Sequence, residues 1–173
     1  MKSLFVILLI FSNSLLAGTP TDVLQAFQKG AKEQKFEAVW KHTAQFEGAS
    51  PQIIQYLRSR TQRIINLSAD GWDFEILEEK IKGDCAVLLV NEYKNDKQTS
   101  LNIDPVFMIK QGHEWRVFPG LTNWDLTQTI PLQHQPQSMK LDEAQIAAFK
   151  EFEIWVDKRT NALQKQKREQ GKP

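Results

Sequence analysis

Near residue 71 of this chain the spacing of apolar residues changes from a helical period to alternation. Before that point apolar residues recur every three or four positions, as Val23 and Phe27 do, and Ser50 followed by Pro51 is typical of a helix start. From Trp72 onward the pattern alternates in the runs WDFEI, CAVLLVNEY, TSLNI, VFMIK and WRVF, separated by turn sequences. Helices followed by antiparallel strands predict an α+β domain, with N-terminal helices packed on a curved, cone-like antiparallel sheet.

The run CAVLLVNEY is apolar on both faces and contains the only cysteine of the chain. Alternation divides its centre into two apolar sets, Cys85, Val87 and Leu89 on one face and Ala86, Leu88 and Val90 on the other. No second cysteine and no histidine lies near Cys85 in sequence, and a thiol in this apolar strand lacks the nearby cation or helix N-terminus that lowers a thiol pKa, so we interpret Cys85 as a packing residue rather than a nucleophile. Both faces must then be covered. The N-terminal helices cover one, and either the helix after Asp142 or a second copy of the chain, in a homodimer, covers the other.

The second half of the chain contains an expected strand interruption, a connector and a last helix. Pro105 is expected to interrupt the strands and to mark an edge or a bulge. Residues 119–140 are rich in Gln, Thr and Pro and predict a surface connector. Asp142 and Gln145 then fit a capping box, and residues 141–173 predict a long C-terminal helix with a basic tail. Its apolar stripe has helical spacing and comprises Ile146, Phe149, Phe152, Val156 and Leu163.

The first 18 residues have the parts of a secretory signal peptide: Lys2, an apolar run, and the small residues Ala17 and Gly18. The run is shorter than the ~20 residues that cross a bilayer, and Thr19 stands where a lipoprotein would have cysteine, so no stable membrane anchor is expected after cleavage. Of the 22 basic and 21 acidic residues only Lys2 lies here, and the remaining neutral chain argues against a nucleic-acid binder. We expect an exported protein, periplasmic or secreted, whose single cysteine forms no internal disulfide.

Residues 19–118 contain, in order, the run TPTDVLQAFQKGAKEQKFEAVWKHT, a capped helix, and strands that end in FMIKQGHEWRVF. This order of elements resembles the nuclear transport factor 2-like superfamily, with its cystatin-like α+β cone. The resemblance implies a cone with an internal cavity. Small exported members are mostly binding modules for a ligand or a partner, whereas others are isomerases, dehydratases or cyclases that use acid and base groups inside the cone. The extension over residues 119–173 departs from the superfamily, whose members usually end at the last strand.

Acid/base catalysis in such a cone needs polar groups aimed into an apolar cavity. The candidates are His42, Asp73 and Tyr56, with Asp104 as a further one. Alternation places Asp73 opposite the apolar set of its strand, and we favour a solvated or capping role for each of these residues. No histidine pair or Asp-rich loop has the spacing of metal ligands, so neither a metal nor another cofactor is expected.

Three functions remain open, and the residues favour the first. It is a non-catalytic exported module that binds a small apolar ligand or a protein partner, with Trp124, Trp40 and Tyr93 as candidate contacts. The second is a cone-fold enzyme of the isomerase or dehydratase type. The third is an assembly or scaffold protein of the cell envelope, which forms a dimer through the outer sheet face or the last helix.

Overall fold

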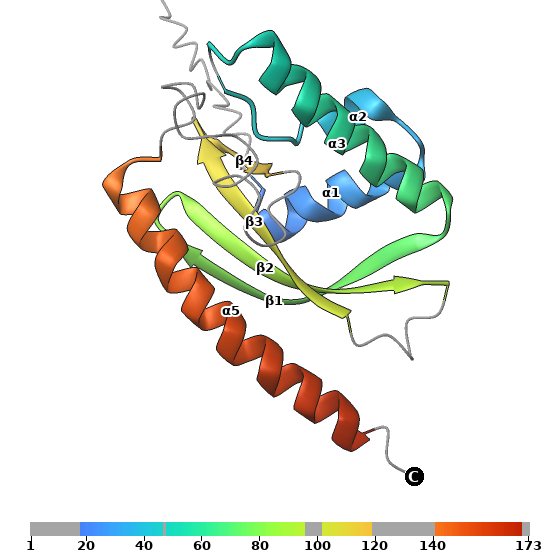
Figure 1. The fold of residues 1–173 in the computed structure, drawn as a ribbon, viewed down its shortest axis with the longest axis vertical. Coiled ribbons are helices and arrows are strands. Elements are labelled where there is room, and N and C mark those ends of the chain that lie inside the picture. Colours follow the sequence, from blue (N-terminus) through green and yellow to red (C-terminus); the bar gives the residue numbers. More distant parts are fainter. Residues whose placement is uncertain (1–17, 47, 96–101, 119–140, 171–173) are drawn as a thin grey trace, which may run out of the picture.

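Figure 1 shows the computed structural model of this protein, which describes residues 18–46, 48–95, 102–118 and 141–170. Residues 1–17 of the expected signal peptide, the expected connector and Trp124 lie outside the described residues. No described helix combines the length and the apolar composition that a membrane span requires.

Three helices come first, as the apolar spacing predicts: α1 (Pro20–Lys32), α2 (Phe36–Trp40) and α3 (Pro51–Ala69). Thr19 caps α1 through a capping box, because its hydroxyl accepts the Asp22 N–H at 3.1 Å and the Asp22 carboxylate accepts the Thr19 N–H at 2.8 Å. Ser50 caps α3 and accepts the Ile53 N–H, with Pro51 in the first helical position. Local capping chemistry therefore determines where both long N-terminal helices begin.

The sheet consists of β1 (Trp72–Lys82), β2 (Cys85–Lys94), β3 (Asn102–Gln111) and β4 (Glu114–Val117), all antiparallel in the order β1-β2-β3-β4. The expected interruption at Pro105 is wrong, because β3 runs through it and Pro105 pairs with Leu89. The expected edge is found, since β4 pairs only with Met108–Gln111 and no other described strand lies beside β3 at Pro105. An imino nitrogen that cannot donate is tolerated there.

Both faces of β2 are covered, and the two covers come from opposite ends of the chain (Figure 1). Residues 85–91 are each at most 1% exposed. Helices α1 and α3 pack on the face that carries Ala86, Leu88 and Val90, whereas α5 (Glu143–Gln170) packs on the face that carries Cys85 and its alternating partners. The last helix of the same chain thus packs on the outer face of β2.

Helix α5 begins and packs largely as the sequence predicts. The Asp142 carboxylate accepts the Gln145 N–H at 2.8 Å, and the Gln145 side chain accepts the Asp142 N–H at 3.0 Å, which completes the capping box. Phe152 and Ala148 are buried, whereas Ile146, which belongs to the predicted apolar stripe, is 42% exposed. The helix therefore packs mainly through its middle turns.

Charged pairs fix α5 along β1. Glu151 accepts hydrogen bonds from Lys80, at 2.7 Å, and from Lys82, and these bonds lower the pKa of Glu151 to about 2. Arg159 donates twice to the Glu78 carboxylate and holds its pKa below the ordinary value. The bidentate geometry restricts the rotation and register of α5 on the sheet more than a single contact would.

Candidate functional site

A cavity of about 390 Å³ lies between α1, α3 and the inner face of the sheet. Its apolar lining comes from the same stripes that form the main core, so the residues that make the fold also make the cavity. Helices α1 and α3 lie on one side of the sheet and α5 lies on the other (Figure 1), so the cavity is on the side of the sheet away from α5. Its apolar lining residues are Leu24, Phe27, Ala31, Ile64, Leu67, Trp72, Phe74, Val90, Pro105, Val106, Val117 and Phe118.

Two carboxylates, Glu92 and Asp104, interrupt the apolar sheet wall of this cavity. Because Val90 pairs with Asp104, and Glu92 with Asn102, the two acidic residues are diagonal neighbours on one face. Burial raises the pKa of Glu92, and the negative charge of Asp104 raises it further. Burial also raises the pKa of Asp104, against the effect of a hydrogen bond from Asn102. The Asn102 amide donates to Glu92 at 3.3 Å, so it lies beside both acids.

The opposite wall, on α3, carries Arg60 and Arg63. The Arg60 guanidinium lies 6.0 Å from the ring centroid of Tyr56, which is at the outer limit of a cation–π contact. Within the described ranges, neither arginine forms an ion pair with a carboxylate. Their guanidinium groups are therefore available to an acidic group that enters from solvent.

Asp73 also lines the cavity, but its carboxylate is already bound by several groups. Lys32 lies 2.6 Å from it, Gln28 donates to it at 2.5 Å, and the Tyr93 hydroxyl donates to it at 3.0 Å. Burial raises the pKa of Asp73, but these bonds and one from the Phe74 backbone outweigh burial and leave the pKa below its ordinary value. The solvated position that alternation predicts is thus wrong: β1 is the edge strand, and α1 reaches Asp73 there. Asp73 joins α1 to the sheet as a stable anion.

The other candidates are not brought together in the cavity. His42 follows α2 and is half-buried outside the cavity lining, and burial, then Lys41 and Arg116, lower its pKa. Tyr56 lies on α3 beside Arg60 but does not line the cavity. Tyr93 binds Asp73, and burial followed by that hydrogen bond raises its pKa. The set His42, Asp73 and Tyr56 therefore forms no acid/base pair.

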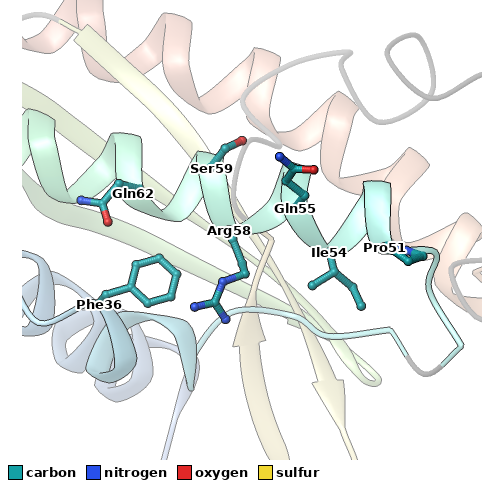
Figure 2. A pocket seen from close by; sticks show the side chains of 7 residues that line it. All are labelled: Phe36, Pro51, Ile54, Gln55, Arg58, Ser59 and Gln62. Carbon is teal, nitrogen blue, oxygen red and sulfur yellow. The ribbon is translucent and has the colours of Figure 1, made fainter.

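Trp40 belongs to the outer surface of the helical layer. It stacks on Phe36 with ring centroids 6.0 Å apart, and the Arg58 guanidinium lies 4.6 Å from the Phe36 centroid and 5.2 Å from that of Trp40. Figure 2 shows Arg58 between Phe36 and Ile54, in a hollow of about 630 Å³ along the outside of α3. This hollow is wide open, and Arg58 is also paired with Glu37 at 3.6 Å. The inner cavity, with walls from two helices and all four described strands, is the stronger candidate.

The charged residues of the inner cavity were mostly missed by reasoning from the sequence. The signal for Glu92 was its place on the same alternating face as Val90, where a charged residue interrupts an apolar set. Asp104 was among the candidates, but its pairing with Glu92 depends on the register of β2 and β3. For Arg60 and Arg63 the helical period indicated only that they lie outside the apolar stripe. Among the described residues, no group of three or more His, Cys, Asp or Glu side chains is placed to hold a metal ion.

Comparison with known proteins places the resemblance at the level of the fold. No protein-family model matches this sequence, and no curated protein matches it. Among solved structures, a "Putative NTF2-like transpeptidase" from Campylobacter jejuni is similar over 58% of this chain and 98% of its own, with 19% identity and a TM-score of 0.47. An "NTF2-like protein of unknown function" from Cytophaga hutchinsonii is similar over 58% of this chain and 88% of its own, with 12% identity and a TM-score of 0.36.

A "Putative calcium/calmodulin-dependent protein kinase type II association domain" from Thiobacillus denitrificans is similar over 59% of this chain and 91% of its own, with 12% identity and a TM-score of 0.42. The described residues form an α+β fold, in which helices pack on a curved antiparallel sheet and a long C-terminal helix is added, and part of this fold is similar to these three structures. At such low identity the likeness concerns the fold alone.

Proposed function

We propose that this protein is an exported, non-catalytic binding module that holds a small ligand with an apolar body in the cavity between α1, α3 and the sheet. The observation that carries the proposal is the cavity itself: about 390 Å³, with an apolar lining and a few polar groups on opposite walls. Small-molecule sites are concave and mostly apolar, with a small number of placed polar groups that orient the ligand. Of the acid/base candidates that the sequence indicated, His42 and Tyr56 lie outside the cavity lining and Asp73 is already paired, which favours binding over catalysis.

A neutral fluorescent probe tests this proposal without knowledge of the natural ligand. N-Phenyl-1-naphthylamine, an uncharged dye whose emission rises in apolar surroundings, is titrated into the purified protein. Val106→Trp places a large side chain in the cavity and is expected to abolish dye binding. The matched control is Ile154→Trp, because Ile154 is 73% exposed on α5 and far from the cavity lining. A third variant, Ile54→Glu, tests the outer hollow of Figure 2.

The proposal predicts that only Val106→Trp removes dye binding, and circular dichroism confirms that each variant is folded. Loss of binding in Ile54→Glu, with normal binding in Val106→Trp, assigns the dye to the outer hollow and contradicts the proposal. Absence of dye binding in the unaltered protein contradicts it as well. Export is tested separately, by fractionation of cells and determination of the N-terminus of the mature protein, which is expected after Ala17 or Gly18.

One observation favours a second function, a cone-fold enzyme that uses general acid/base chemistry. Glu92 and Asp104 are neighbouring carboxylates in an apolar cavity, and each has a raised pKa. A carboxyl group whose pKa is raised by burial keeps its proton to a higher pH and is better suited to act as a general acid. The two functions differ in turnover. An enzyme converts the compound that fills the cavity, and Glu92→Gln then abolishes conversion but retains binding, whereas a binding module returns every ligand unchanged.

A further inference from the structure

The inner cavity has a buried apolar interior and a partly exposed mouth. Leu24, Val90 and Val117 line it and are buried. Leu67, which is 38% exposed, and Trp72, which is 37% exposed, line the same cavity and reach solvent. A ligand in this cavity can therefore bury an apolar part in the interior and keep one end beside water at the mouth.

Two arginines of α3 line the cavity beside its exposed apolar residues. Arg60, Arg63 and Leu67 are three and four positions apart, so they share one side of the helix. Arg60 is half-buried, and Arg63 is exposed. Within the described residues neither guanidinium group forms an ion pair with a carboxylate, so both retain donors for an anion at the mouth.

We propose that the ligand is a small amphiphilic acid, whose apolar chain fills the buried interior of the cavity and whose carboxylate binds Arg60 and Arg63 at the mouth. This inference rests on the proposed function and specifies the chemistry of its ligand. A carboxylate suits this position because guanidinium groups present their donors in a planar fork that matches its two oxygens. The apolar side chains nearby strengthen the attraction compared with the same contact in water.

The opposite wall of the cavity favours the same orientation. Glu92 and Asp104 lie on the sheet wall, and a side-chain hydrogen bond from Asn102 reaches each of them. Glu92 thus already has partners in the fold, and an amine would have to compete with them. Negative charge on these two acids repels a carboxylate from the sheet wall, which leaves the α3 wall as the place for the head group.

The test is displacement of N-phenyl-1-naphthylamine at pH 7 by three compounds of equal chain length: octanoic acid, octan-1-ol and octylamine. Octanoic acid, which is ionised at this pH, is expected to bind about tenfold more tightly than octan-1-ol, which is the typical weight of one charge-assisted contact. Octylamine is expected to bind no better than octan-1-ol. The double variant R60Q/R63Q should reduce the affinity for octanoic acid to that for octan-1-ol and leave the affinity for octan-1-ol unchanged.

The matched control is R58Q, which makes the same kind of change on the same helix. Arg58 lines the outer hollow of Figure 2 and not the inner cavity, so R58Q should preserve the advantage of octanoic acid over octan-1-ol. The single variants R60Q and R63Q replace the double variant if it does not fold. A second measurement needs no variant: because salt screens exposed charges, an increase in sodium chloride from about 0.05 M to about 1 M should reduce this advantage in the unaltered protein.

The outcomes separate the ligand class from the proposed function. If octanoic acid binds no better than octan-1-ol, or keeps its advantage in R60Q/R63Q, the ligand class is wrong although the cavity still binds the dye. Tighter binding of octylamine than of octanoic acid would overturn the ligand class as well, because it would assign the polar contact to the sheet wall. If neither the dye nor any of the three compounds binds, the proposed function itself fails.

Discussion

Replacement of Asn91 by leucine should stabilise this protein, although it removes a polar side chain from the centre of a strand. Asn91 is fully buried, and neither its amide nitrogen nor its amide oxygen has a hydrogen-bond partner among the residues that the structure describes. It lies on the α5 face of β2 and pairs with Ile103, which belongs to the apolar cluster under α5. The hydroxyl of Thr160, which follows Phe152 and Val156 at four-residue spacing on α5, is also buried without a partner.

The size of the effect follows from the unpaired groups. A buried polar group without a partner costs about 1–3 kcal/mol, and leucine, which has nearly the same shape, adds apolar contact at a repacking cost of less than about 1.5 kcal/mol. We therefore expect Asn91→Leu to raise the free energy of unfolding by about 2 kcal/mol, or the melting temperature by about 4–8 °C for a chain of this size. Thr160→Val, an isosteric change that removes the other unpaired group, should add a smaller gain.

The assay is urea denaturation followed by tryptophan fluorescence, with the slope of the free energy against urea checked for constancy. Asn91→Ala is the control, because it removes the amide but leaves a void, and it should stabilise less than leucine or destabilise. A lower free energy of unfolding for Asn91→Leu would refute the reasoning, since it would mean that the amide is satisfied in solution, for example by a buried water shared with Thr160. A double-mutant cycle between positions 91 and 160 would then show strong coupling.

Three further predictions test the packing and the ionisation of buried groups. Phe152→Ala should lower the free energy of unfolding in urea by about 3–5 kcal/mol, because Phe152 is fully buried between α5 and the sheet; a loss below about 1 kcal/mol would show that α5 is not packed there. Burial, with the charges of Asp142 and Asp84, raises the pKa of the Cys85 thiol to about 11, so a disulfide reagent at pH 8 should modify it only after unfolding, and immediate modification of the native protein would contradict this. Glu92→Gln should raise the melting temperature at pH 7. Because the pKa of Glu92 is raised, the stabilising effect of this residue is present below its ordinary pKa of 4.5 and is lost as the pH rises through its pKa in the folded protein. The gain should vanish in acid, and a gain that persists there would contradict the electrostatic cause.

The agreement between sequence and structure is closest where local rules apply. The periods of the apolar residues predicted the helices and strands, and the capping residues Thr19, Ser50 and Asp142 mark helix starts that depend on a few neighbouring atoms. The two apolar faces of the segment around Val87 required two covers, and the structure provides both. Pro105 shows the limit of such rules: the expected break is absent, because β4 is short and leaves Pro105 on an edge.

By itself, the sequence determined the kinds and order of elements, the burial of β2 on both faces, and the packing role of Cys85, since each depends on residues close together in the chain. Only the tertiary structure decided that α5 packs on the outer face of β2, and that Asp73 is a paired anion. It also placed two carboxylates and two arginines around one cavity. These outcomes depend on strand register and on which helices meet which face, and no local period encodes such contacts between residues far apart in the chain.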